Sequence, residues 1–107
     1  MLLKRLAVRL LPKPLLMWGK RQYYARAVPR FWEPEVDPIT LIVKPGDMAI
    51  DLGANIGWYT CVLARLVGEE GKVLAVEPIP VTFELLSSVV ERLGLRNVEL
   101  FNCAVSD

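Results

Sequence analysis

A short apolar run that ends in a carboxylate and leads into two closely spaced glycines constrains this chain more than any other stretch. Residues 48–57 read Met-Ala-Ile-Asp-Leu-Gly-Ala-Asn-Ile-Gly, and residues 58–67 have helix-forming character. A strand, a glycine turn and a helix N-terminus bring backbone N–H groups and the positive end of the helix dipole together, which suits an anion or a nucleotide. We therefore predict a strand over 48–52, a ligand-binding turn and a helix over 58–67.

Four residues of this stretch are candidate ligand contacts. Gly53 allows a sharp turn and a close approach of a ligand to the backbone, and Gly57 allows the helix to start close to the strand. Asn55 tolerates left-handed backbone angles, and Asp51 ends the strand at the edge where α/β sheets bind ligands. The G-x-x-x-G spacing is not the full dinucleotide fingerprint, so a tight turn with no ligand remains an alternative.

A second apolar run, residues 73–76, also leads into a carboxylate, that of Glu77. Glu77 lies 20 positions after Gly57. An acid at about this spacing, at the tip of the second strand, can accept hydrogen bonds from ribose hydroxyls. The alternative for Glu77 is a solvated strand end. The alternative for Asp51 is a carboxylate that only caps the turn or the following helix.

The rest of the chain continues the alternation of strands and helices. Apolar residues at helical spacing predict a helix over 81–93, and residues 97–102 form a third candidate strand. Right-handed crossovers place three parallel strands in the order 3-2-1, which is half of a doubly wound sheet. The first strand lacks alternation, so we predict burial on both of its faces. It would also be left as an unpaired edge beside a bare apolar helix face, and we therefore expect the chain to be a fragment or a truncated gene product.

Four blocks of the chain together resemble one known family. They are residues 51–60 (Asp-Leu-Gly-Ala-Asn-Ile-Gly-Trp-Tyr-Thr), 71–78 (Gly-Lys-Val-Leu-Ala-Val-Glu-Pro), 94–98 (Gly-Leu-Arg-Asn-Val) and 104–107 (Ala-Val-Ser-Asp). In order and spacing they resemble the FkbM family of S-adenosylmethionine-dependent methyltransferases, from about Val43 to the end of the chain. The resemblance implies an α/β fold: the βαβαβ first half of a Rossmann-like class I methyltransferase sheet, preceded by a basic helical arm.

The resemblance also implies roles for the candidate residues. The turn residues Gly53, Ala54, Asn55 and Gly57 would line the amino-acid part of S-adenosyl-L-methionine. Asp51 would hold the cofactor's ammonium through water or the turn backbone, and Glu77 would bind the ribose hydroxyls. Many methyltransferases carry an acid after the third strand, where this chain has Asn-Cys-Ala at 102–104. The adenine contact therefore departs from that pattern.

The resemblance implies a small-molecule acceptor, a hydroxyl on a sugar or natural product, with no nucleic-acid partner. No catalytic base can be assigned, because the family's acceptor-binding half lies beyond residue 107. Two other functions stay open: a nicotinamide-dependent oxidoreductase fragment, and a non-catalytic remnant tethered to a membrane or a partner by its basic arm. The oxidoreductase fits less well because the middle glycine that admits a pyrophosphate is missing.

The charge of the chain is unevenly distributed. Residues 1–30 carry eight Lys or Arg and no acid, whereas the remainder carries twelve acids and five bases. We divide the chain into a basic, aromatic-containing arm and linker (1–44), with an amphipathic helix over 2–10 ended by Pro12 and Pro14, and a half methyltransferase domain (45–107). Such an arm suits an anionic partner, peripheral membrane contact included. We expect a cytoplasmic location, no metal site, since the two cysteines lack metal-binding spacing, and no His-based chemistry, since histidine is absent.

Overall fold

The structure, a computed structural model, describes residues 10–106 and consists of a three-stranded sheet with helices on one side. Its elements in chain order are α2 (Lys13–Ala27), the 3-10 helix η1 (Val28–Arg30), α3 (Val36–Ile42), β1 (Met48–Leu52), α4 (Trp58–Val67), β2 (Lys72–Val76), α5 (Pro80–Arg92) and β3 (Val98–Phe101). The helix predicted over residues 2–10 lies, except for its last residue, outside the described residues. The proposed division at residue 44 stays a prediction.

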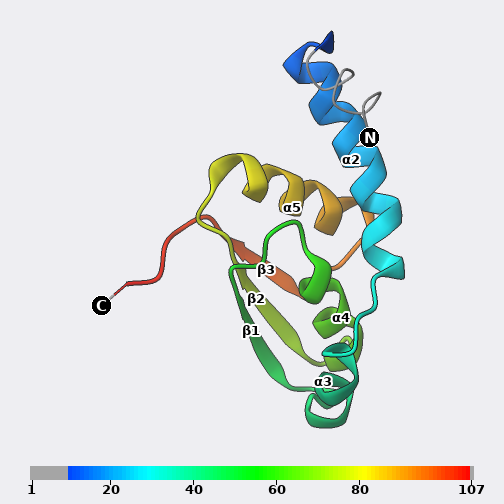
Figure 1. Ribbon diagram of the computed structural model, residues 1–107. Coiled ribbons are helices and arrows are strands. Elements are labelled where there is room, and N and C mark those ends of the chain that lie inside the picture. The colour runs from blue at the N-terminus through cyan, green and yellow to red at the C-terminus, as the bar shows by residue number, and fades with distance from the viewer. Residues whose placement is uncertain (1–9, 107) are drawn as a thin grey trace.

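The sheet confirms the predicted α/β fold and strand order. Its strands are all parallel and follow the order β1-β2-β3, with Asp51 opposite Ala75 and Val76 opposite Phe101. Figure 1 shows α4 and α5 on the same side of the sheet, because two crossovers of the same hand return to the same face. The carboxyl ends of all three strands therefore meet along one edge.

The carboxyl end of α4, at the opposite edge of the sheet, is closed by a glycine and by a side chain. Gly68 adopts a φ of 66° and its N–H donates to Ala64, which ends α4 at the predicted residue. The Asn97 side-chain amide donates to the carbonyls of Ala64 and Gly68 at 2.8 and 2.9 Å. These bonds give each of the two carbonyls a second donor, beside the N–H groups of Gly68 and Gly71, and they tie α4 to the start of β3.

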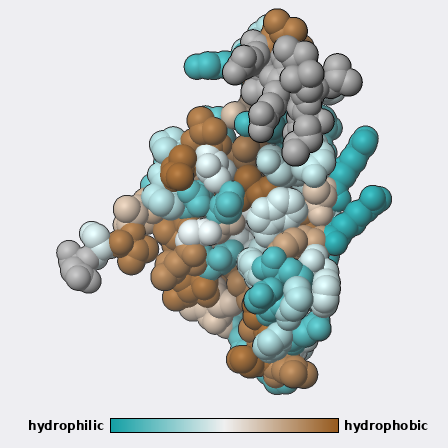
Figure 2. All heavy atoms as spheres, viewed as in Figure 1, coloured by the Kyte–Doolittle hydropathy of each residue, from teal (hydrophilic) through white to brown (hydrophobic). Residues whose placement is uncertain are grey.

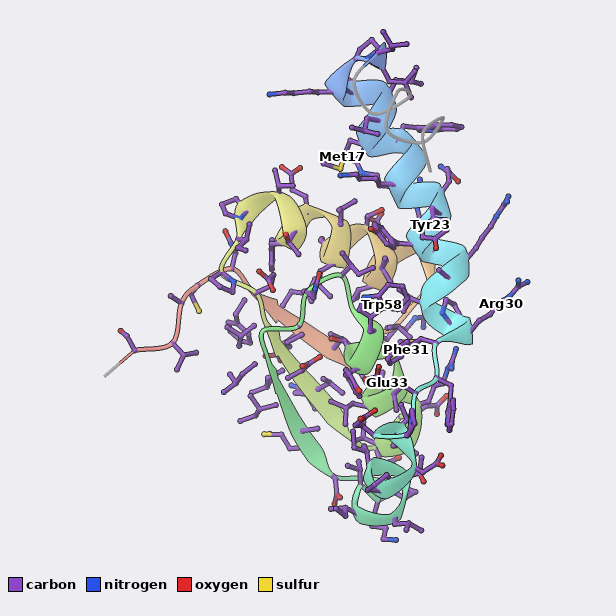
Figure 3. All side chains as sticks on the ribbon, viewed as in Figure 1. Met17, Tyr23, Arg30, Phe31, Glu33 and Trp58 are labelled. Atoms are coloured by element: carbon purple, nitrogen blue, oxygen red, sulfur yellow. The ribbon has the colours of Figure 1, made fainter. Side chains whose placement is uncertain are left out.

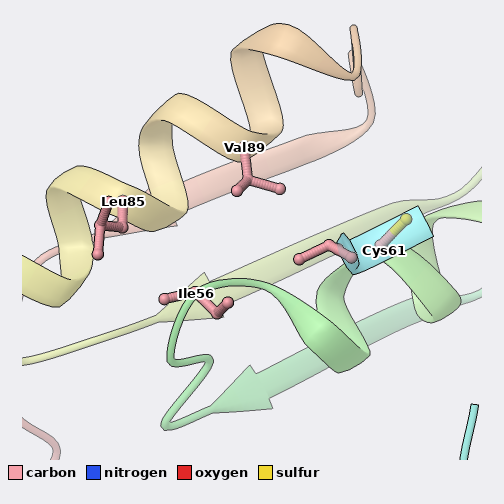
Figure 4. Close-up of a cluster of buried hydrophobic side chains, with 5 residues drawn as sticks. Ile56, Cys61, Leu85 and Val89 are labelled. Atoms are coloured by element: carbon pink, nitrogen blue, oxygen red, sulfur yellow. The ribbon is translucent and has the colours of Figure 1, made fainter. Parts of the chain in front are cut away.

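The core lies between the sheet and the two helices. One cluster joins the glycine turn to α4 and α5 through Ile56, Cys61, Leu85 and Val89 (Figure 4), with Val28 of η1 completing it. The burial of Val28, with 1% of its surface exposed, shows that the arm is part of this core. The position of the turn next to α5 thus depends on apolar packing, which fixes the candidate site from behind.

The prediction that β1 is buried on both faces is wrong. Met48, Ile50 and Leu52 point to the face without helices and expose 67, 60 and 61% of their surfaces. Both crossover helices lie on the other face, so nothing among the described residues covers this one. Figure 2 shows hydrophobic side chains gathered over this part of the sheet. The bare apolar surface therefore belongs to the sheet, where the sequence had indicated a helix face.

The arm is more helical than its sequence suggests. The prolines expected to end the first helix also start a second one: α2 follows Pro12 and has Pro14 in its first turn, where a missing N–H costs nothing. Its aromatics pack onto the start of α4: the Tyr24 and Phe31 rings lie 5.9 and 5.3 Å from that of Trp58 (Figure 3). No helix of the described part is both long and apolar enough to cross a bilayer.

Candidate functional site

The six predicted site residues lie together at the carboxyl ends of β1 and β2. The turn after β1 is anchored to the end of β2, since the N–H groups of Gly53 and Ala54 both donate to the Val76 carbonyl at 2.9 Å. Asn55 is the non-glycine residue with a left-handed backbone, at a φ of 55°, as its residue type had indicated. The turn therefore has one defined shape, fixed against the neighbouring strand.

The Glu77 carboxylate bridges the two loops of this edge. Its Oε1 accepts the Asn55 N–H at 2.9 Å, and its Oε2 accepts the Ile79 N–H at 3.0 Å. Only 5% of Glu77 is exposed, so it is not the solvated strand end considered as its alternative. Each carboxylate oxygen can accept a second hydrogen bond, which leaves acceptor capacity on the side facing the turn.

Gly57 is required by its surroundings as well as by its backbone. Its φ is 106°, and a Cβ at this position would lie 3.2 Å from Cδ1 of Leu86 in α5. A side chain here would therefore push α5 away from the start of α4. The close packing that the sequence analysis assigned to Gly57 is present, although its neighbour is the second helix rather than the strand.

Asp51 is held by a residue that the sequence analysis did not select. The fully buried Thr60 donates its hydroxyl to Asp51 Oδ2 at 2.7 Å across the start of α4. Burial raises the pKa of the Asp51 carboxyl above its usual value, and the hydrogen bond from Thr60 lowers it by less. Thr60 could have been found as a polar residue on the buried face of the predicted helix, one turn after Gly57.

Asn102 supports the second loop from the end of β3. Its side-chain amide donates to the carbonyls of Glu77 and Pro78 at 2.9 and 3.2 Å. From the sequence, Asn102 stands out only as the replacement for a common acid. The structure gives it a different task, which is to hold the backbone on which the Glu77 carboxylate depends.

The turn is not the anion site that its strand–turn–helix pattern indicated. The N–H groups of Gly53, Ala54, Asn55 and Gly57 are all hydrogen-bonded within the protein, to Val76, Glu77 and Ala54. They cannot also surround a phosphate. Two carboxylates, those of Asp51 and Glu77, face this edge instead. The arrangement therefore suits a ligand with a cationic group and hydroxyl donors, and disfavours a pyrophosphate.

The pH dependence of stability tests the environment of Asp51. Because the folded pKa lies above the unfolded value of about 4, the folded state binds more protons between these two values. Stability therefore falls as the pH rises through this window. We expect Asp51→Asn to remove this slope and to be more stable than the wild type at neutral pH, whereas Thr60→Val should extend the slope to higher pH. Urea unfolding between about pH 4 and 7 measures both effects, and identical slopes in all three proteins would contradict them.

A family model described as protein-L-isoaspartate(D-aspartate) O-methyltransferase matches residues 36–105, more than half of the chain. The chain belongs to this family. The resemblance to the FkbM family was therefore wrong. Two of the four quoted blocks, residues 51–60 and 71–78, contain the glycine turn and the acidic strand end. These features position a cofactor and so do not separate one methyltransferase family from another.

Three known proteins illustrate the relationship. Ribosomal RNA large subunit methyltransferase E of Bdellovibrio bacteriovorus is 35% identical over 81 residues, covering 76% of this chain and 40% of the relative. Protein-L-isoaspartate O-methyltransferase of Methanocella arvoryzae is 36% identical over 61 residues, covering 57 and 32%. Fibrillarin of Aeropyrum pernix, whose crystal structure contains natively bound S-adenosyl-L-methionine, is 27% identical in sequence. The match covers 58% of this chain and 26% of fibrillarin, with a TM-score of 0.54.

These comparisons confirm the class I methyltransferase fold and the predicted cofactor, S-adenosyl-L-methionine. They also correct the predicted partners. The relatives' names refer to protein and ribosomal RNA, so the expectation of a small-molecule hydroxyl acceptor and no nucleic acid is wrong. A cofactor site alone carries no information about the acceptor. The chain spans less than half the length of these relatives.

Proposed function

We propose that this chain binds S-adenosyl-L-methionine at the carboxyl ends of β1 and β2, as the cofactor-binding part of a methyltransferase that acts on a macromolecule. Gly53, Ala54, Asn55 and Gly57 line the amino-acid part of the cofactor. Asp51 faces its ammonium, and Glu77 accepts hydrogen bonds from the ribose hydroxyls. The cofactor supplies a methyl group on a sulfonium, and these residues bind and orient it.

The observation that carries this proposal is the Glu77 bridge. A carboxylate held by the N–H groups of Asn55 and Ile79, at 2.9 and 3.0 Å, has a fixed orientation before any ligand arrives. Two hydroxyls of a ribose can then bind without reorganising the loops, which lowers the cost of association. The same bridge sets the distance between the ribose end of the site and the turn that lines the other end.

The hydrogen bonds of the turn argue against the nicotinamide alternative. A dinucleotide needs free N–H groups for its pyrophosphate, and those of Gly53, Ala54 and Asn55 are already used. Asp51 and Glu77 would also repel a phosphate, whereas they attract the net positive charge that the sulfonium and ammonium give to S-adenosyl-L-methionine. The site therefore favours the methyl donor on both grounds.

Calorimetry with separate ligands tests the proposal. S-adenosyl-L-methionine and S-adenosylhomocysteine should both bind, because they share the ribose and the amino-acid part. NAD should bind at least about tenfold more weakly, because one unfavourable contact between its phosphates and these carboxylates costs about 1.4 kcal/mol, which is a factor of ten in affinity. Methylthioadenosine, which lacks the amino-acid part, serves as the control for the Asp51 end of the site. Equal affinity for NAD and S-adenosyl-L-methionine would contradict the proposal.

The relatives' names offer two acceptor classes, protein isoaspartate and ribosomal RNA. The uneven charge of this chain is the specific observation that favours RNA. All of the excess positive charge lies in the first 30 residues, and a nucleic acid is the polyanion that such a segment attracts. A cytoplasmic location suits either acceptor and stays a prediction.

A further inference from the structure

One side of α2 and η1 presents arginines and aromatic rings together to solvent. We propose that this side binds single-stranded RNA, and we call it the arm surface; it consists of Trp18, Gln22, Tyr23, Arg26 and Arg30. The inference rests on the proposed function only for the choice of a macromolecular acceptor. RNA binding itself requires neither the cofactor nor its site.

The residues of the arm surface lie side by side because of their spacing in the sequence. Trp18, Gln22 and Arg26 follow one another at intervals of four residues, which places them along one ridge of α2, and Arg30 ends η1 directly after it. Gln22, Tyr23, Arg26 and Arg30 line a shallow groove beside it. Trp18 and Tyr23 expose 57 and 62% of their surfaces, although rings of this size are usually buried. In Figure 3, Arg30 points away from the sheet.

The charges of the arm surface are not neutralised by neighbouring acids. Residues 10–30 contain no Asp or Glu, and the ion pair found among the described residues joins Lys72 to Glu99, far along the chain. The nearest acids in sequence have other partners: Glu33 accepts the Tyr59 hydroxyl and Asp37 accepts the Trp32 indole N–H. Long hydrophilic side chains project from this side in Figure 2.

Arg21 is excluded from the arm surface for the opposite reason. It lines a separate groove between α2 and α5 that also contains Glu84 and Glu91. A negatively charged ligand would meet these two carboxylates there. Among the arginines of α2 and η1, Arg21 therefore faces acidic neighbours, whereas Arg26 and Arg30 do not.

The other side of α2 fixes the arm surface to the methyltransferase core. Met17 and Tyr24 pack against the cluster that contains the buried Val28. The Tyr23 ring meets Tyr24 edge-on at 5.2 Å, and Tyr24 meets Trp58 at 5.9 Å. Trp58 directly follows Gly57 of the turn. A base stacked on Tyr23 is therefore connected to the cofactor turn through packed rings, without a flexible linker.

The mixture of residue types favours RNA over a bilayer. Single-stranded RNA offers exposed bases that stack on Trp and Tyr rings, and phosphates that pair with guanidinium groups. A helix lying in a membrane surface needs a contiguous apolar face opposite its basic one. On the arm surface Gln22, Arg26 and Arg30 lie in the same row as Trp18, so insertion into a bilayer would bury charged groups.

Fluorescence anisotropy with a labelled oligouridylate of about 20 nucleotides tests the inference on the 107-residue chain without cofactor. We expect Arg26→Glu/Arg30→Glu to weaken binding about tenfold or more, and to lower the slope of log affinity against log salt by about 1 to 2. Trp18→Ala/Tyr23→Ala should weaken binding about tenfold with an unchanged salt slope, since stacking on a base is worth about 1 to 3 kcal/mol.

The matched control is Lys44→Glu/Arg96→Glu, which makes the same change in net charge at two exposed positions outside the arm surface. It should keep most of the affinity. Equal losses in the control and in the arginine pair would overturn the inference, as would no binding by the wild type. Binding to vesicles of phosphatidylcholine and phosphatidylserine is measured as well. Tighter arginine-dependent binding to vesicles than to RNA would also overturn the inference. Calorimetry with S-adenosyl-L-methionine is read independently, so failure of one proposal is distinguishable from failure of the other.

Discussion

Replacing Glu77 by alanine is expected to reduce the affinity for S-adenosyl-L-methionine at least about a hundredfold and to destabilise the fold. If Glu77 binds the ribose as we propose, the variant removes two charge-assisted hydrogen bonds, each worth about 1.5 to 3 kcal/mol, and tenfold corresponds to about 1.4 kcal/mol. It also leaves the N–H groups of Asn55 and Ile79 without their acceptor. Two such groups cost about 2 to 4 kcal/mol of unfolding free energy, measured by urea titration.

Two further variants separate binding from stability. Glu77→Gln keeps one amide oxygen for one backbone N–H but presents an NH₂ to the other, so it should recover part of the stability and little of the affinity. Glu84→Ala removes an exposed carboxylate from α5 and should change the unfolding free energy by less than about 0.5 kcal/mol. Full affinity in Glu77→Ala would show that the ribose does not bind this carboxylate.

The strand–turn–helix unit was predictable from the sequence almost residue by residue. The bounds of β1 and α4 agree with the prediction because two glycines and a strand-ending acid are local signals. The bounds of β2, α5 and β3 differ by one residue at one or both ends, which is the usual fraying of element ends.

What the sequence could not provide depends on distant contacts. The apolar run of β1 indicates two buried faces, but burial depends on what covers each face, and both crossover helices lie on one. Thr60 became part of the site through a hydrogen bond to a residue nine positions earlier. The loss of the anion site likewise depends on Val76 and Glu77, which occupy the N–H groups of the turn.

The cofactor and acceptor predictions relied on different signals, which explains why the cofactor prediction was correct and the acceptor prediction wrong. Every signal used for the cofactor lies in β1, β2 and the loops that follow them. The acceptor prediction relied on family membership alone, and the family differed. The residues that we propose to meet the acceptor lie in α2 and η1, outside the quoted blocks, and the proposal rests on their charge and exposure rather than on a motif.

Gly71→Ala is expected to be the most destabilising of the glycine substitutions, although Gly71 has an ordinary backbone conformation. A Cβ at Gly71 would overlap the side chain of Val67 and lie 2.6 Å from the carbonyl oxygens of Asp47 and Val67. Hydrogen bonds fix the backbone around these two carbonyls. The Gly46 N–H donates to the Val67 carbonyl at 2.8 Å, and the Lys72 N–H donates to the Asp47 carbonyl at 3.0 Å. The chain cannot move away without breaking these bonds, so we expect a loss of about 3 kcal/mol in urea unfolding.

Gly19→Ala is the matched control and should have the opposite sign. Gly19 lies inside α2 with nothing within 4 Å of its added Cβ, so alanine should stabilise the protein by about 0.5 to 1 kcal/mol through helix propensity alone. Because Gly71 lies at the amino-terminal edge of the sheet, opposite the cofactor site, the Gly71→Ala protein that remains folded should bind S-adenosyl-L-methionine normally. A Gly71→Ala protein as stable as the wild type would mean that the turn before β1 is not held against α4 as the structure has it.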